Sequence, residues 1–323
     1  MTSAFLRKSE AESVSGSATQ SRLKIGLALG AGAARGWAHI GALQELAELG
    51  VAPDIVAGSS IGALVGGCYA AGRLEALEGF ARSLTKRRVF GLLDFSLSGA
   101  GLIGGDKLRQ RLQESIGATR IEDLPYRFAA VATELTSGHE IWLKRGPLVE
   151  AMRASYAMPG VFEPVNIGGR WLFDGAVVNP VPVSVARALG ADCVIALNLM
   201  VDGAGHGVSN FDFDAGADAA LAASAPGDVE RSAHKLLRPW RNSRGAPGLA
   251  TTMAAAFNIS QDRIMRSRLA GDPPDVVVNL KVGAIGIFEF HRADELIALG
   301  REAVRRARAD IAERLELSAP AES

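Results

Sequence analysis

Cysteine is scarce in this 323-residue chain, and no long hydrophobic run interrupts it. The two cysteines, Cys68 and Cys193, each sit in an apolar stretch, which predicts buried thiols in a reducing compartment and excludes a disulfide framework. No run reaches the length of a membrane-spanning helix, and the N-terminus lacks the apolar core of a signal peptide. We therefore expect a soluble cytoplasmic protein, with peripheral contact at the inner membrane surface left open.

An excess of charge is also missing, because 35 Lys and Arg residues balance 35 Asp and Glu residues. A dedicated nucleic-acid-binding protein usually carries a basic excess, so this balance argues against nucleic acid as a partner. The 48% of apolar residues allows a large core and excludes global disorder. Only the polar ends, residues 1–22 and 317–323, are expected to be disordered tails.

Apolar runs and helical periodicities alternate from residue 23 onward. Residues 23–30 and 53–58 read as buried strands, and residues 37–49 and 59–72 read as helices. This order predicts an α/β fold with a mainly parallel central sheet and helices on both faces. Further strands are expected within residues 126–135, 139–146, 165–176 (a hairpin), 191–199 and 274–280, and further helices within 147–160, 181–190, 251–271 and 292–315.

The composition shifts to Gly, Ala, Ser and Asp after residue 200. We therefore expect one domain over residues 23–316, with a flexible insertion at 201–250 and a closing region of helix and strand at 251–316. On the helix at 251–271, Met253, Phe257 and Ile264 fall on one face, which predicts the side that packs on the core.

A glycine-rich loop, GAGAARG, follows the first predicted strand. Gly30 and Gly32 fit the dinucleotide pattern G-x-G-x-x-G, but the third position is Arg35, and Gly36 comes one residue too late. The Gly-Lys-Ser/Thr of a P-loop is missing as well. Backbone N–H groups at a helix N-terminus still attract negative charge, including an oxyanion that exists only during a reaction. The alternative is a tight strand-to-helix turn that binds nothing.

A second glycine motif, GSSIG, has Ser60 at the centre of a G-x-S-x-G pattern. It follows a predicted strand and opens a predicted helix, which is the context of a nucleophile elbow. A serine N-cap, at Ser59 or Ser60, is the ordinary alternative for such a stretch. The strand-turn-helix context favours a nucleophile.

A serine nucleophile needs a base, and Asp174 in FDGAVVNP is the candidate that the sequence offers. Taken alone, Asp-Gly after a strand is an ordinary turn signal. None of the five histidines lies in a recognisable motif, and His39 on the first helix is expected to pack or to form a local hydrogen bond. A Ser-Asp dyad therefore explains the sequence better than a triad.

The chain resembles the patatin-like phospholipase family through three motifs in this order: GAGAARG, GSSIG and the DGA at Asp174. It resembles the bacterial branch of that family through three longer stretches: RGWAHIGAL, AMPGVFEPV and DGAVVNPVPVSVARALGAD. The resemblance implies a three-layer α/β/α fold and a serine acyl hydrolase that uses neither histidine, metal nor cofactor. Ser60 would be the nucleophile and Asp174 the proton acceptor. Further site residues implied are Gly30, Gly32, Ala33, Arg35 and Gly36 for the oxyanion and substrate, and Gly58, Gly62, Gly175 and Ala176 in the motifs.

Several interpretations remain open within this resemblance. Ala31 and Ala33 stand where many family members have glycine, so a position that requires φ > 0 would be strained. Arg35 would bind a substrate phosphate or hydrogen-bond nearby carbonyls, the second being favoured. The expected partner is a lipid or acyl-ester substrate. Residues 88–103 and the basic stretch at Arg305, Arg306 and Arg308 are candidate membrane-contacting surfaces, with ordinary packing and a solvated helix face as the alternatives.

Rival functions are a carboxylesterase or thioesterase on the same dyad, a non-catalytic lipid-binding protein, and, more distantly, a nucleotide-binding oxidoreductase. The sequence does not define the head group, the acyl chain, the position cleaved or the oligomeric state.

Overall fold

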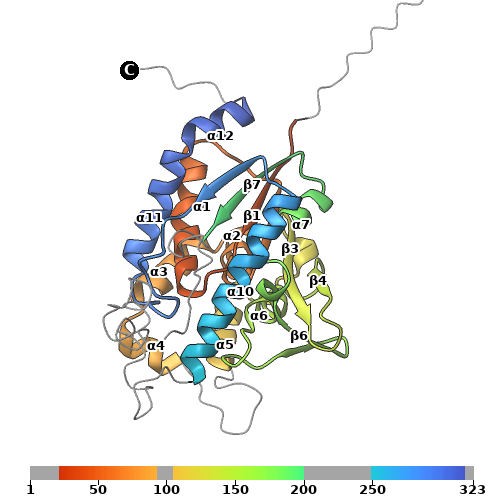
Figure 1. Ribbon diagram of the computed structural model, residues 1–323, viewed down its shortest axis with the longest axis vertical. Coiled ribbons are helices and arrows are strands. Elements are labelled where there is room, and N and C mark those ends of the chain that lie inside the picture. The colour runs from red at the N-terminus through yellow and green to blue at the C-terminus, as the bar shows by residue number, and fades with distance from the viewer. Residues whose placement is uncertain (1–21, 93–104, 200–248, 317–323) are drawn as a thin grey trace, which may run out of the picture.

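The computed structural model describes residues 22–92, 105–199 and 249–316. These residues form one eight-stranded sheet with helices on both sides (Figure 1). The strands are β1 (Ile25–Leu29), β2 (Ile55–Ser59), β3 (Arg127–Glu134), β4 (Glu140–Leu143), β5 (Val165–Ile167), β6 (Arg170–Asp174), β7 (Cys193–Asn198) and β8 (Val276–Asn279). The α-helices are α1 (Ala38–Glu48), α2 (Ile61–Ala70), α3 (Leu74–Ser83), α4 (Lys86–Leu92), α5 (Asp106–Ile116), α6 (Leu148–Tyr156), α7 (Val183–Ala188), α10 (Leu249–Gly271), α11 (Ala293–Arg306) and α12 (Arg308–Leu315). Short 3-10 turns are η1 (Ala33–Trp37), η2 (Ile121–Asp123) and η3 (Gly175–Val177).

The sheet is parallel through its centre, in the order β3, β2, β1, β7, β8, while β4, β5 and β6 are antiparallel additions on the β3 side. Parallel strands need helical crossovers and are covered on both faces, which explains their continuous apolar sequences. The mainly parallel α/β sheet predicted from the sequence is confirmed.

Alternate residues of each central strand enter two different cores, one on each face of the sheet. Leu27 and Leu29 of β1 pack with the residues of α1, α2 and α11, whereas Ala28 packs with α7 and with Met265 of α10. This alternation follows from the two-residue period of a strand. The result is the three-layer α/β/α arrangement, with α1 and α11 on one side of the sheet and α10 on the other (Figure 1).

The register on β3 explains how two distant segments meet. Ser59, the last residue of β2, lies opposite Val131, and Asp174, the last residue of β6, lies opposite the adjacent Ala132. Because β4 occupies the other edge of β3 here, β2 and β6 run toward each other along one edge. Their carboxyl ends therefore converge, although the two segments are 114 residues apart at Ser60 and Asp174.

Two predicted elements differ from the structure. The single helix expected over 292–315 is broken at Ala307 into α11, which packs mainly on α1, and α12, which contacts β8 and α11. The predicted packing face of α10 is also wrong at its N-terminal end, where Met253 is 51% exposed and Gln261 and Met265 are the buried residues.

Some expectations lie outside the described residues. These are the N-terminal tail except Arg22, the C-terminal tail, the insertion at 201–250 except its last two residues, and most of the candidate membrane-contacting stretch at 88–103. Over the residues that are described, no helix combines the length and apolar character needed to span a bilayer.

Candidate active site

Ser60 occupies a sharp turn between β2 and α2. Its backbone angles, φ 56° and ψ −125°, fall in a region that residues with a Cβ rarely adopt. The glycines on either side allow this turn because there is no room for side chains: a Cβ on Gly62 would lie 2.2 Å from the Leu29 carbonyl oxygen, and one on Gly58 would lie 2.5 Å from the Ala63 nitrogen. The G-x-S-x-G spacing is thus a steric requirement of this turn.

The Ser60 hydroxyl donates a hydrogen bond to Oδ2 of Asp174 at 2.7 Å. The second carboxylate oxygen, Oδ1, accepts the backbone N–H of Ala176 at 2.8 Å, and Thr133 Oγ1 donates to the Asp174 carbonyl. Asp174 is fully buried, and this burial raises the pKa of its carboxyl group to about 7, against the lowering effect of the Ser60 and Ala176 hydrogen bonds. The carboxyl group is therefore poised to exchange a proton near neutral pH.

Close packing also explains the glycine that follows the aspartate. A Cβ on Gly175 would lie 2.2 Å from the Val131 carbonyl oxygen, so only glycine lets η3 turn against β3. This turn is what brings the Ala176 N–H onto the carboxylate.

Ser155 is a site residue that the sequence analysis missed. Its hydroxyl on α6 is fully buried and accepts the Ser60 backbone N–H at 3.0 Å. The hydrogen bond satisfies the amide of a strained residue and ties the turn to a second helix. Its sequence signal was the one serine of this helix, in MRASYAM, among neighbours that are mostly apolar and buried.

The glycine loop, residues 30–36, lies beside the Ser60 turn. Three of its amides donate to carbonyls from distant parts of the chain: Gly30 to Leu197, Ala31 to Pro180 and Ala34 to Ile287. The two amides between them, those of Gly32 and Ala33, donate to no described residue and border the same pocket as Ser60. Gly32 and Ala33, whose amides have no described partner, therefore line the same pocket as Ser60.

The individual loop residues have distinct constraints. A Cβ on Gly32 would lie 2.9 Å from the Leu199 side chain, and one on Gly36 would lie 2.1 Å from Ile61, the first residue of α2. Gly36 therefore lets the loop pack closely against α2, which is a steric role and is unrelated to nucleotide binding. Ala33 has φ 50°, so the strain foreseen for an alanine in this loop is present.

His39 forms a local hydrogen bond with the first residue of the glycine loop. It is fully buried on α1, and its Nε2 lies 2.8 Å from the Gly30 carbonyl oxygen. Burial lowers the pKa of His39 to about 4, against the opposite effect of the Gly30 hydrogen bond, so the ring is neutral at pH 7. The Nε2 must then carry the proton that it donates to Gly30.

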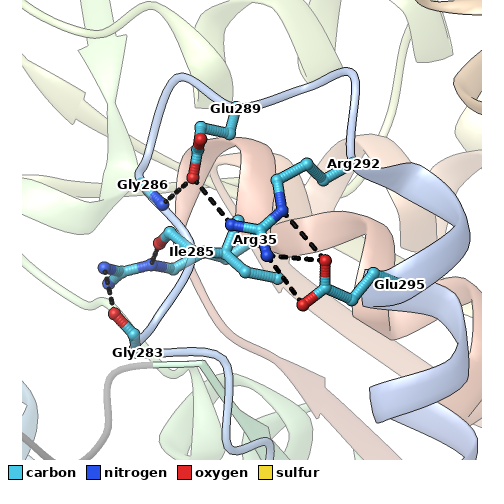
Figure 2. Close-up of polar contacts among 7 residues, drawn as sticks. All are labelled: Arg35, Gly283, Ile285, Gly286, Glu289, Arg292 and Glu295. Atoms are coloured by element: carbon cyan, nitrogen blue, oxygen red, sulfur yellow. Dashed lines mark hydrogen bonds and ion pairs between the residues drawn. The ribbon is translucent and has the colours of Figure 1, made fainter. Parts of the chain in front are cut away.

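The Arg35 side chain extends into the turn formed by residues 283–289 (Figure 2). Its Nε donates to the Ile285 carbonyl at 2.7 Å, and a terminal nitrogen donates to the Gly283 carbonyl at 3.4 Å. Burial lowers the pKa of Arg35, while the negative charge of nearby Glu289 acts in the opposite direction. The favoured alternative, a guanidinium bound to carbonyls, is the one observed.

A small pocket lies in front of Ser60. It is lined by Gly32, Ala33 and Ser60, by Met158 and Ile287, and by three residues of α10, namely Phe257, Asn258 and Gln261. None of these eight described residues is charged. The α10 residues and Ile287 were not foreseen, because their approach to Ser60 is set by the packing of the C-terminal region.

Other residues highlighted by the sequence are accounted for away from the site. Cys68 and Cys193 are buried and unpaired with each other, as expected. Arg305 binds Glu45 of α1 at 2.9 Å and Arg306 binds Glu302, so these two members of the basic stretch are held in ion pairs. Within the described ranges, no three His, Cys, Asp or Glu side chains are grouped to hold a metal ion.

Comparison with known proteins finds a matching family and several similar proteins. The model of the family described as patatin-like phospholipase matches residues 27–187. An NTE family protein of Mycobacterium tuberculosis is 36% identical over 321 residues, covering 86% of this chain and 89% of its own length. A lysophospholipase of Candida glabrata is 32% identical over 183 residues, which is 54% of this chain and 10% of that protein. The solved structure of VipD from Legionella pneumophila aligns with a TM-score of 0.46 at 13% identity, over 91% of this chain and 67% of that one.

The family match begins in β1, includes the Ser60 turn and the Asp174 turn, and ends in α7. The Mycobacterium relative extends the similarity over most of the remaining chain. This protein is therefore a member of the patatin-like phospholipase family.

Proposed function

We propose that this protein is a serine acyl hydrolase that cleaves ester bonds of lipids, with Ser60 as the nucleophile and Asp174 as the proton acceptor. The family membership supports lipid acyl hydrolysis in general terms. The 2.7 Å hydrogen bond from the Ser60 hydroxyl to the buried Asp174 carboxylate is the single observation that carries the finer proposal.

In the first half of the reaction, Ser60 Oγ attacks the ester carbonyl carbon while its proton passes to Oδ2 of Asp174. The new Oγ–C bond forms as the carbonyl π electrons move to oxygen. When this tetrahedral species collapses, the bond to the leaving alcohol breaks and Asp174 returns the proton to the alcohol oxygen. The products are an acyl-enzyme and a free alcohol.

Water completes the cycle. The water oxygen attacks the carbonyl carbon of the acyl-enzyme while Asp174 takes a proton from that water molecule. The carboxyl proton then returns to Ser60 Oγ as the fatty acid leaves. A single carboxylate thus serves both halves, and its pKa near 7 suits it to accept and release protons at neutral pH.

The N–H groups of Gly32 and Ala33 would stabilise the oxyanion in both halves. They border the Ser60 pocket and are not used by other described residues. Loss of one such donor typically lowers turnover by about 10²–10³-fold. The strained backbone at Ala33 is consistent with a loop held in place for this purpose.

The test is hydrolysis of a lysophospholipid and of a short-chain ester by Ser60→Ala and Asp174→Asn. We expect turnover to fall by about 10⁴-fold or more for Ser60→Ala and by about 10³–10⁴-fold for Asp174→Asn. Ser137→Ala and Asp310→Asn make the same chemical changes at exposed positions and should keep wild-type rates. A folded Ser60→Ala or Asp174→Asn protein with wild-type turnover would contradict the dyad.

A panel that adds an acyl thioester separates lipid hydrolysis from simple esterase or thioesterase activity. Labelling of Ser60 by a fluorophosphonate separates an enzyme from a lipid-binding protein. We expect labelling of the wild type and none of Ser60→Ala.

A further inference from the structure

Gln261 is an unusual residue for the position it holds on α10. The buried face of this helix continues from Gln261 to Met265 one turn later, and Met265 belongs to the core on that side of the sheet. Gln261 itself is only 6% exposed. The Gln261 amide is not one of the fully buried polar atoms that lack a partner, so it reaches the accessible space of the pocket that Gln261 lines.

Its side chain has no hydrogen-bond partner among the described residues, and it borders the pocket that contains Ser60. Asn258, one turn earlier on α10, borders the same pocket and is half-buried. Two neutral amide side chains therefore line the same pocket as Ser60, Gly32 and Ala33.

The other lining residues indicate which chemical group of a substrate the Gln261 and Asn258 amides would contact. Met158, Phe257 and Ile287 are apolar and suit a hydrocarbon chain. An alkyl chain against Gln261 would leave its amide unpaired, whereas a hydroxyl group would both donate to it and accept from it. None of the described residues that line the pocket is charged, and Arg35 is occupied by the Ile285 and Gly283 carbonyls, so none of these residues is placed to neutralise a phosphate.

We infer that Gln261, assisted by Asn258, is a specificity-determining residue that binds a neutral, hydroxyl-bearing alcohol half of the ester, such as glycerol. The inference rests on the proposed function, because it assigns the leaving-group side of the Ser60 site. It concerns the choice among substrates, while Ser60 and Asp174 carry out the bond cleavage.

The test compares two esters of one fatty acid, a monoacylglycerol and the ethyl ester, and measures the ratio of their kcat/KM values. We expect Gln261→Leu to lower this ratio by tenfold to a hundredfold, since a site that hydrogen-bonds a hydroxyl loses most of its preference when the partner is removed. Asn258→Leu should lower the ratio by a smaller factor. Gln110→Leu makes the same change as Gln261→Leu on the exposed side of α5 and should leave the ratio unchanged.

Circular dichroism and fluorophosphonate labelling of Ser60 check that each variant is folded with an assembled site. An unchanged ratio in Gln261→Leu, or an equal loss with both esters, overturns the inference and assigns Gln261 a packing role. If Gln261→Leu does not fold, Asn258→Leu decides by the same criterion. A wild-type protein that neither labels at Ser60 nor hydrolyses either ester instead overturns the proposed function itself, and the specificity assignment falls with it.

Discussion

Two strand-to-helix turns meet at the carboxyl ends of β1 and β2, and they are held in different ways. The Ser60 turn takes its shape from its own sequence: Gly58 and Gly62 permit close contacts with Ala63 and with the adjacent strand β1. The glycine loop is held from far away, through the carbonyls of Leu197, Pro180 and Ile287 and through Arg35, whose partner Ile285 is 250 residues distant.

The Ser60 turn thus depends on contacts of its own motif, whereas the glycine loop depends on residues that are distant in the sequence. A short motif is enough to specify a strained turn that exposes a hydroxyl, because the steric conflict is local. The shape of the glycine loop, in contrast, depends on partners far along the chain, because the amides of Gly30, Ala31 and Ala34 donate to the carbonyls of Leu197, Pro180 and Ile287. Disturbing the first turn should therefore affect folding, whereas disturbing the loop should affect activity more than folding.

The largest expected effect comes from Gly62→Ala in the Ser60 turn. The added Cβ would lie 2.2 Å from the Leu29 carbonyl oxygen, in a backbone position that cannot yield without moving β1. We expect a loss of about 3 kcal/mol or more in the free energy of unfolding, or no folded protein. Urea denaturation of the Gly62→Ala and wild-type proteins measures this difference in the free energy of unfolding.

Gly79→Ala on α3 is the matched control. A Cβ there meets no atom within 4 Å, so it should be neutral or stabilising by up to about 1 kcal/mol. Equal stability of the Gly62→Ala and wild-type proteins would mean that local sterics do not define the turn.

The next effect is electrostatic and involves Asp174. Its pKa is about 7 in the folded protein and near 3.8 when unfolded, so the folded state binds more protons between these values. The free energy of unfolding is thus greatest below pH 3.8 and falls as the pH rises through 7. Asp174→Asn cannot ionise and should be more stable than wild type by about 2–4 kcal/mol at pH 8, with no gain at pH 3.5.

The same carboxyl group should govern activity. Because the carboxylate is the active form of the base, kcat/KM of the wild type should rise with pH and level off above about 7. Thermal unfolding of the wild type and of Asp174→Asn at pH 3.5 and pH 8 tests the expected stability difference. A pH–rate profile of the wild type tests the expected rise in activity. A stability gain that does not depend on pH would show that Asp174 stays ionised when buried.

Arg35→Met tests the long-range support of the glycine loop. Losing the bonds to Ile285 and Gly283 should cost about 1–3 kcal/mol of stability and lower turnover by about tenfold to a hundredfold, because the Gly32 and Ala33 amides lose their alignment. The loss should be equal for a lysophospholipid and an uncharged ester. A selective loss with the lysophospholipid would instead indicate phosphate binding by Arg35. Arg109→Met, which removes an exposed ion pair with Glu150, is the control.

The smallest effect is expected from Ala33→Gly. Glycine adopts φ 50° without strain, so the substitution should stabilise the protein by about 0.5–1 kcal/mol even after its greater freedom when unfolded is counted. Ala31→Gly, two residues before Ala33 and not at a positive φ, should change stability in the opposite direction. Chemical denaturation of the two variants side by side provides the measurement.

The sequence by itself determined the local features of this protein. The alternation of apolar runs predicted the parallel sheet, since buried strands need apolar residues on both faces, and the flanking glycines predicted the Ser60 turn, since no other residue fits there. The order of the three motifs indicated the family. Each of these rests on interactions between residues close together in the chain or on a repeating pattern.

Only the tertiary structure decided how the site is assembled. The meeting of β2 and β6 on one edge of β3 brings Asp174 to Ser60, and no spacing along the chain encodes that register. The same holds for Ser155 behind the turn, for Arg35 in the 283–289 turn and for Gln261 in the pocket, where the periodicity of α10 had pointed to Met253. Helical spacing defines which residues share a face, but the direction of that face depends on how the helix packs against the rest of the molecule.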